Sequence, residues 1–336
     1  MAAKKRNNTL WLLIGFLIVA VAAYFLIGEE EKETKTEALA KEMKFATPGN
    51  EVYKIFLAKR SGEETTLERK DDYWVYNGKY RANQNVVDNL LQTISHVTVK
   101  FIPSSSMQPN IIKELATLGI KVELYDASDN LIKAYYVGGM TNNELGTHMI
   151  MEGSDRPFVC YLETAQGGLR ARFDMEGDEW RDKALYREKP EQIEKVTIEY
   201  PLQKSQSFVL ERKGKEFEVS PLDPLSKSPT FKADETKVNS FLVGFDKVIA
   251  EAFENSNPKR DSILSLLPFA TIQIIRKGGE EKLVQYFPID KDLTDNVTGE
   301  KLPVERYYAQ EKGGDFYLVQ QRVVGKLFWG YSNFIQ

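Results

Sequence analysis

Hydrophobic and polar positions divide the chain into an apolar start and a long patterned body. Residues 10–27 form an uncharged apolar run, LWLLIGFLIVAVAAYFLI, close to the roughly 20 residues that a helix needs to cross a bilayer. Lys4, Lys5 and Arg6 precede the run and glutamates at 29–31 follow it, and cationic flanks stay on the cytoplasmic side. The pattern predicts a single-pass transmembrane helix with a cytoplasmic N-terminus and an extracytoplasmic body.

Two aromatic residues stand near the ends of this run. Trp11 and Tyr24 are typical of the membrane interface, where amphipathic rings lie at the headgroup level. The alternative is a cleaved signal peptide, since residues 20–22 (AVA) have the small-x-small form of a cleavage site. The apolar run continues past that site, which favours the anchor.

The body contains an internal repeat. The tetrapeptide LERK occurs at residues 67–70 and again at 210–213. After each copy comes an aromatic-basic-Ala-Asx signal, YRAN at 80–83 and FKAD at 231–234. Such self-similarity at two places indicates a duplicated structural unit.

Both copies of the signal open a helical pattern. Apolar residues then recur with the 3.6-residue spacing of one helix face, namely Val87, Leu90, Leu91, Ile94 and Val97 in the first copy and Val238, Phe241, Leu242, Phe245 and Val248 in the second. Asn83 and Asp234 are the expected N-caps, because their side chains can accept from the free amides of the first turn.

Strand patterns follow each helix. Residues 120–139 and 270–289 predict hairpins with turns at 128–130 and at Gly278-Gly279. Each copy therefore predicts an antiparallel sheet with a packed helix, so the expected fold class is α+β, two tandem similar domains behind an N-terminal transmembrane helix. We expect the following segments: 1–28, cytoplasmic tip and transmembrane anchor; 29–50, charged stalk; 51–175, first repeat; 176–189, connector; 190–325, second repeat; 326–336, aromatic tail.

Composition excludes some function classes. The formal net charge of -4 argues against a nucleic-acid partner, which requires a clustered basic surface. Cys160 is the only cysteine and His96 and His148 the only histidines, so we expect no nucleophile-base pair. Cys160 lies in a strand-like run and is expected to be a buried hydrophobic residue.

Candidate ligand sites are weak in this sequence, and no catalytic, cofactor-binding or metal-binding residue is predicted. The three glycines Gly138, Gly139 and Gly146 do not have phosphate-loop spacing and are expected in turns. The acidic residues of 174–182 do not have the spacing of an EF-hand loop and are expected to be a solvated connector.

One string stands out at the predicted connector, Trp180, Arg181, Asp182 and Lys183. An aromatic residue beside alternating charges predicts a domain joint, with Trp180 buried and Arg181 paired to a carboxylate. A partner-docking spot is the alternative. The aromatic tail 326–336 is expected to pack as a last element, or else to contact the bilayer or a membrane partner.

Several of these strings resemble a known family. They are YRAN with the paired leucines of its helix, L-x-x-L-G-I at 115–120, Val137-Gly138 with the later Gly146, and the string at 180–183. Together they resemble the bacterial domain-of-unknown-function family of single-pass envelope proteins associated with gliding-type ABC-transporter subunits. The resemblance covers residues 65–200 well and the second copy more loosely.

The resemblance implies an accessory or scaffold protein of an ABC-type export or envelope system, held in the inner membrane with its body in the periplasm. It implies no cofactor and no catalytic residue, and its partners would be the membrane and a membrane protein such as an ABC-transporter subunit. The alternative function is a periplasmic glycan-binding module or a carboxylate-dependent envelope enzyme, which requires acidic side chains that converge in a cleft.

Overall fold

The computed structural model describes residues 35–223, 225–289, 294 and 300–335. The chain divides into two compact units, unit 1 up to Glu176 and unit 2 from Gly177. The predicted transmembrane helix, with Trp11 and Tyr24, lies outside the described residues. Among the helices that are described, none has the length and apolar character needed to cross a bilayer.

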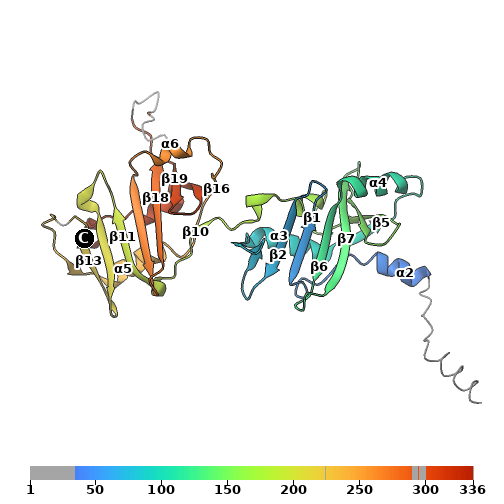
Figure 1. Ribbon diagram of the computed structural model, residues 1–336, viewed down its shortest axis with the longest axis horizontal. Coiled ribbons are helices and arrows are strands. Elements are labelled where there is room, and N and C mark those ends of the chain that lie inside the picture. The colour runs from blue at the N-terminus through green and yellow to red at the C-terminus, as the bar shows by residue number, and fades with distance from the viewer. Residues whose placement is uncertain (1–34, 224, 290–293, 295–299, 336) are drawn as a thin grey trace, which may run out of the picture. The chain divides into compact units, whose positions relative to one another are not determined.

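Unit 1 is an antiparallel sheet with helices on its faces (Figure 1). Its sheet order is β4-β3-β2-β1-β6-β7-β8-β9-β5. The elements are α2 (Lys35–Glu42), β1 (Lys54–Ala58), β2 (Glu64–Arg69), β3 (Trp74–Tyr76), β4 (Tyr80–Arg81), α3 (Gln84–His96), β5 (Thr98–Phe101), α4 (Gln108–Leu118), β6 (Ile120–Tyr125), β7 (Leu131–Met140), β8 (Thr147–Met151), β9 (Phe158–Tyr161) and the 3-10 turn η1 (Arg170–Arg172).

Unit 2 has the same strand order, β14-β13-β12-β11-β17-β18-β19-β20-β16. Its strands are β10 (Ala184–Tyr186), β11 (Ile193–Glu199), β12 (Phe208–Lys213), β13 (Glu216–Pro221), β14 (Phe231–Lys232), β15 (Val248–Ile249), β16 (Ala252–Phe253), β17 (Ala270–Arg276), β18 (Glu281–Pro288), β19 (Arg306–Glu311) and β20 (Phe316–Gln320). Its helices are α5 (Glu235–Val243), α6 (Arg260–Leu264), α7 (Gln321–Val324) and α8 (Ser332–Ile335), with 3-10 turns η2 (Gly177–Trp180), η3 (Pro190–Gln192), η4 (Lys204–Gln206) and η5 (Gly325–Leu327). The α+β class and the duplicated antiparallel body are therefore confirmed.

The repeated strings occupy equivalent places in the two units. Leu67 of the first LERK lies in β2 and Leu210 of the second in β12, the third strands of their sheets. The side chain of Asn83 accepts from the backbone of α3, and that of Asp234 accepts from the backbone of α5. Both predicted N-caps are confirmed.

The arginine of the first LERK explains part of the repeat. Arg69 donates from Nε to the carbonyl of Val52 at 3.1 Å and from its terminal nitrogen to that of Gly49 at 2.6 Å. Its guanidinium lies 4.9 Å from the centre of the Trp74 ring. Because a guanidinium is a fork of rigidly placed donors, it ties the residues before β1 to the sheet.

The arginine of the second LERK makes the same contacts in unit 2. Arg212 donates to the carbonyl of Ile193 at 3.1 Å and to that of Pro190 at 2.9 Å. Its guanidinium lies 4.3 Å from the centre of the Phe217 ring. The tetrapeptide is therefore repeated together with a structural role for its arginine.

The end of the predicted stalk is part of unit 1. Phe45 is fully buried, and the amide of Thr47 donates to the carbonyl of Ile94 at 3.0 Å. Lys133 donates to the three carbonyls of residues 44–46. In the predicted stalk, α2 covers Lys35–Glu42.

The end of the predicted connector is likewise part of unit 2. Tyr186 is buried, and β10 pairs with β15. The amide of Glu188 donates to the carbonyl of Phe245 at 2.9 Å. The boundary between the compact units falls after Glu176, at the first residue of the predicted connector.

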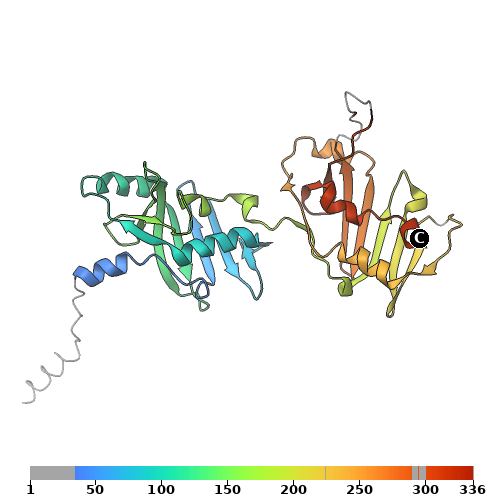
Figure 2. The ribbon, with the colours of Figure 1, turned by 180° about the vertical axis from the view of Figure 1, so that it is seen from behind.

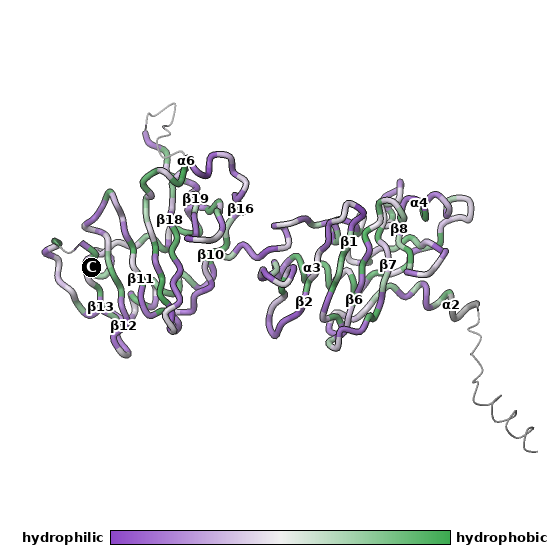
Figure 3. The backbone as a smooth tube through the Cα atoms, viewed as in Figure 1, coloured by the Kyte–Doolittle hydropathy of each residue, from purple (hydrophilic) through white to green (hydrophobic). Residues whose placement is uncertain are grey.

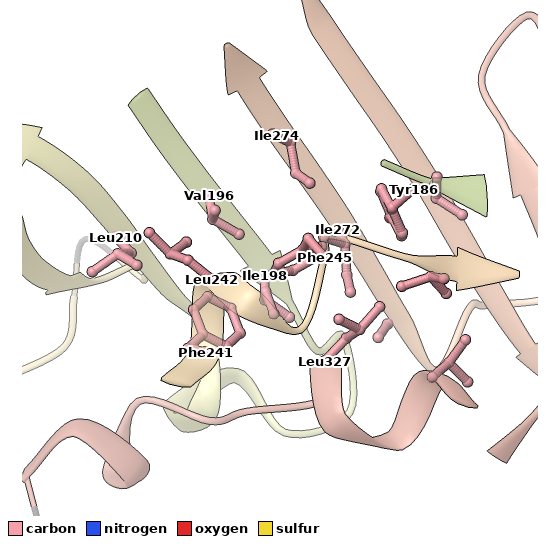
Figure 4. Packing of buried hydrophobic residues seen from close by; sticks show 14 of the residues in the cluster. Tyr186, Val196, Ile198, Leu210, Phe241, Leu242, Phe245, Ile272, Ile274 and Leu327 are labelled. Atoms are coloured by element: carbon pink, nitrogen blue, oxygen red, sulfur yellow. The ribbon is translucent and has the colours of Figure 1, made fainter. Parts of the chain in front are cut away.

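Helices α3 and α5 cover one face of their sheets, as seen from behind in Figure 2. In unit 2 the buried residues Phe241, Leu242 and Phe245 meet the side chains of Val196 and Ile272 (Figure 4). Hydrophobic segments follow the strands of both units, whereas the hairpin ends beside β2 and β12 are hydrophilic (Figure 3). Burial of these apolar side chains, at about 1.5–3 kcal/mol each, drives the packing of helix on sheet.

The aromatic tail completes the core of unit 2. Tyr331 and Phe334 are buried, and the ring of Phe334 lies 5.1 Å from that of Phe208. Trp329 lies 5.3 Å from Phe241. The tail therefore packs as a last element, the first of the two sequence expectations.

Unit 1 has a helix that the sequence pattern did not predict. Helix α4 lies on the sheet face opposite to α3, because it packs against Tyr136 and Ile150. Side chains alternate along a strand, so Tyr136 and Ile150 point away from the core that contains Tyr135 and Met149.

Candidate functional site

A hollow of about 640 Å³ opens beside α4, and we name it the unit 1 hollow. It lies between the end of β5, the first turns of α4, the β7–β8 loop and β8. Its lining residues are Phe101, Ile102, Pro103, Ser104, Ser106, Met107, Asn110, Ile111, Glu114, Met140, Thr141, Asn142, Asn143, His148 and Val159. Its volume is in the range of small-molecule sites.

Two strand glycines allow α4 to lie close to the sheet. A Cβ atom at Gly138 would lie 2.7 Å from Cδ2 of Leu115, and one at Gly139 would lie 2.6 Å from Oε1 of Glu114. Both glycines are inside β7. The prediction that they are turn residues is therefore wrong, because what they provide is space for a helix on the strand.

The third glycine of the group also allows a close approach. A Cβ atom at Gly146 would lie 2.6 Å from the carbonyl oxygen of Cys160. Just before it, the hydroxyl of Thr141 accepts from the amides of Leu145 and Gly146 at 3.1 and 3.2 Å. Gly146 thus closes the β7–β8 loop against β9, and the loop forms one wall of the hollow.

Glu114 and His148 are the ionisable groups of the hollow. Within the described residues the Glu114 carboxylate makes no hydrogen bond or ion pair, and the buried Nδ1 of His148 has no hydrogen-bond partner. Burial lowers the pKa of His148, and the nearby Glu114 carboxylate opposes that shift only in part. At neutral pH the site therefore presents a carboxylate beside an uncharged imidazole.

The rim of the hollow is apolar and exposed. The apolar lining side chains that are open to solvent are Phe101 and Ile102 at 41%, Met140 at 44% and Met107 at 51%. A cluster of exposed apolar groups around a concave site is typical of a surface that binds a partner. Methionine adapts its shape to irregular surfaces, which suits such a role.

In unit 2 the residue equivalent to His148 is Tyr308. The strand register shows this, since Met149 pairs with Val137 in unit 1 and Ala309 pairs with Tyr286 in unit 2. By the same register Gln310 stands where unit 1 has Ile150.

Side chains of unit 2 itself fill that equivalent place. The rings of Tyr308 and Phe316 are stacked with centres 5.2 Å apart. Arg260 of α6 donates to Oε1 of Gln310 at 2.9 and 3.2 Å, and its guanidinium lies 5.6 Å from the centre of the Phe316 ring. The two units thus have the same fold but differ in this site.

The string predicted as a domain joint or docking spot begins with a buried residue, since Trp180 is fully buried. Arg181 pairs with Asp178 at 2.6 Å and with Asp315 at 2.5 Å. It also lies 4.2 Å from the centre of the Phe253 ring.

The other two residues of the string also bond within unit 2. Asp182 pairs with Arg187 at 2.6 Å, and Lys183 donates to the carbonyl of Glu251 at 2.9 Å. None of the four lines the unit 1 hollow. A joint or docking role for the string stays a prediction.

The acidic residues Asp174 and Glu176, from the segment 174–182, are paired with cations of unit 1. Lys59 lies 2.9 Å from both Asp174 and Glu176, and Arg170 lies 2.9 Å from Asp174. Burial alone would raise the pKa of the Asp174 carboxyl, but hydrogen bonds from Lys59 and Arg170 outweigh it and lower the pKa. Asp174 and Glu176 are therefore paired within unit 1, whereas Asp178 and Asp182 pair with arginines of unit 2, and Glu179 is exposed.

The single cysteine is a core residue, as predicted. Cys160 is fully buried in β9, and burial raises the pKa of its thiol. Since only the thiolate is a good nucleophile, the environment of this thiol suits packing rather than covalent chemistry.

Sequence reasoning missed α4 and with it the hollow. The available signals were Pro109 in the first turn and the pair Ile111 and Leu115, four residues apart. Glu152 follows His148 by four residues in the sequence, but in the structure Glu152 pairs with Lys121 at 2.9 Å and His148 lies near Glu114.

Comparison with known protein families gives a match to part of each unit. The family model described as domain of unknown function (DUF4340) matches residues 74–265. That range runs from β3 of unit 1 to the end of α6 in unit 2. Neither the curated proteins nor the solved structures contain a significant match to the chain.

Proposed function

We propose, from the premise that the chain belongs to the family of domains of unknown function DUF4340, that it is a binding protein of the cell envelope. It acts as a membrane-anchored extracytoplasmic scaffold, and its partner is a membrane-protein complex. The single observation that carries this proposal is the apolar rim of the unit 1 hollow.

The apolar side chains of the rim can provide binding energy without taking part in a reaction. Four exposed apolar side chains line the hollow, and covering one such side chain contributes about 1.5–3 kcal/mol at most. Part of this is lost to the ordering of both partners. The remainder supports a complex of moderate affinity, which suits an accessory subunit.

The apolar run at residues 10–27 supports the membrane part of the proposal. An anchor of this kind restricts the body to a layer near the bilayer surface, which raises its effective concentration toward other membrane proteins. An ABC-type export system in the inner membrane, with the body in the periplasm, is the partner class that the family resemblance implies.

The alternative function is a glycan-binding module or a carboxylate-dependent enzyme. Glycoside hydrolysis uses two carboxyl groups on either side of the scissile bond. Glu114 is the one carboxylate among the described residues that line the unit 1 hollow. We therefore favour the binding role.

Copurification from native membranes tests the binding role. Charged residues at the rim, introduced by Met107→Glu and Met140→Glu, should reduce the recovered partner at least about tenfold, because each buries a charge in the contact. Leu266→Glu is the matched control, since Leu266 is an exposed apolar residue of unit 2 at 61%. Equal recovery with all three variants would refute the role of the hollow.

The anchor is tested separately. Replacing residues 1–28 with a cleaved signal sequence should release a folded body that no longer copurifies with the membrane partner. Retention of the partner by the released body would contradict the scaffold mechanism.

A further inference from the structure

We infer that the unit 1 hollow binds an extended segment of a partner polypeptide, which adds a strand to the edge of β5 and places a lysine or arginine beside Glu114. This inference rests on the proposed function and adds to it the chemistry of the bound segment.

The edge of the sheet is the first part of this site. Strand β5 is the last strand of its sheet and pairs only with β9 among the described strands. Its residues Thr98, Lys100 and Phe101 are exposed. An edge strand presents a row of amides and carbonyls, and an extended peptide binds there through main-chain hydrogen bonds.

The edge leads directly into the hollow. Phe101 is the last residue of β5, and Phe101, Ile102 and Pro103 are all lining residues. A peptide that pairs with β5 and continues past Phe101 therefore reaches the hollow without a turn. Side chains of a strand alternate in direction, so every second side chain of the peptide can enter it.

Glu114 specifies the charge of the segment. Covering an unpaired carboxylate with apolar groups is costly unless a cation comes with them. His148 does not provide that cation, because burial lowers its pKa. Nor does Lys100, whose ammonium donates to the carbonyl of Leu145 at 3.2 Å and lies over the Tyr161 ring. The partner must bring the positive charge.

Unit 2 has a cationic side chain on the corresponding outer face of its sheet, at the position equivalent to Ile150. Helix α6 follows β16 as α4 follows β5, and its Arg260 lies on Gln310 and the Phe316 ring. There the cation is supplied by the unit itself. Unit 1 has the carboxylate and the open hollow but no such arginine among its lining residues.

A random-peptide display library selected on the full chain in detergent micelles tests the charge. Enriched peptides should carry a lysine or arginine with apolar residues two positions away on either side. Glu114→Lys should change the enriched residue to aspartate or glutamate. Glu68→Lys is the control, since Glu68 lies in β2 away from the hollow, and it should keep the basic preference.

A second variant covers the case that Glu114→Lys does not fold. Glu114→Gln should bind the leading peptide at least about tenfold more weakly while its circular dichroism spectrum stays unchanged. Enrichment of acidic or uncharged peptides, no enrichment at all, or equal binding by Glu114→Gln would each overturn the inference.

The strand geometry is tested on the leading peptide itself. Two peptides are compared, one N-methylated at the odd-numbered backbone amides and one at the even-numbered amides. Only alternate amides of an added strand face β5, so one of the two peptides should lose binding and the other should bind nearly as before. Equal loss of binding in the two methylated peptides would overturn strand addition. If a partner copurifies through the rim but no basic peptide is selected, this inference fails while the proposed function stands.

Discussion

At the residue scale, the partly buried environment of His148 affects its protonation. Burial lowers its pKa, and Glu114 opposes the shift. Protonation therefore favours the unfolded chain, and His148 reduces the stability of unit 1 as the pH falls below the usual histidine value.

The Glu114→Gln change should lower the pKa of His148 further, since it removes the carboxylate that favours the imidazolium. Proton NMR of the ring measures this, and the signal can be assigned because the chain has only two histidines. His148→Asn identifies the second signal as His96. An unchanged or raised pKa in Glu114→Gln would mean that the carboxylate does not face the ring.

The paired arginines Arg69 and Arg212 give a matched test of the repeat. Each makes two hydrogen bonds to carbonyls close to the start of a strand, β1 for Arg69 and β11 for Arg212. Arg69→Gln and Arg212→Gln should each cost about 1–3 kcal/mol of unfolding free energy, measured by denaturant titration.

The neighbour Lys70 provides the control for this pair, because it is exposed and makes one long contact of 3.7 Å with Glu68. Lys70→Gln should change stability by less than about 0.5 kcal/mol. If one of the two arginine variants lowers the unfolding free energy and the other does not, the two arginines do not have equivalent roles.

At the element scale, the position of α4 depends on the glycines beneath it. Gly138→Ala places a Cβ atom 2.7 Å from Leu115 and 3.1 Å from the carbonyl of His148. Because the backbone carbonyl cannot move freely, we expect a loss of about 1–3 kcal/mol and displacement of α4. Lys113→Ala, on the exposed side of α4, is the control.

Thermal unfolding and amide hydrogen exchange along α4 measure this effect. Faster exchange in residues 111–118 should accompany Gly138→Ala and not Lys113→Ala. If Gly138→Ala leaves both stability and exchange unchanged, α4 does not lie against β7 as described.

The helices and strands also show which parts of the fold can be predicted from sequence patterns. The helices α3 and α5 were predicted because their apolar spacing and N-caps, Asn83 and Asp234, are local signals. The β6–β7 and β17–β18 hairpins were predicted for the same reason. The prediction of turns at Gly138 and Gly139 was wrong, because these two glycines make room for helix α4, which is distant from them in the sequence.

At the scale of the whole molecule, the common fold of the two units and the difference between their outer faces have separate origins. The common strand order was predictable from LERK and the helix signals, because these strings recur with their structural roles. The difference at α4 was not predictable from the repeat. It depends on which side chain fills one place on the outer face, His148 in unit 1 or Tyr308 in unit 2, and this becomes visible only after the registers are aligned.

Site-specific photocrosslinking in native membranes tests the central claim most directly, that the unit 1 hollow is where this protein binds its partner. A photoreactive amino acid at Met107, at the rim, should yield a discrete adduct with another membrane or envelope protein. The same group at Leu266 of unit 2, which is also exposed, should yield little of that adduct. No adduct from Met107, or equal amounts from both positions, would contradict the account.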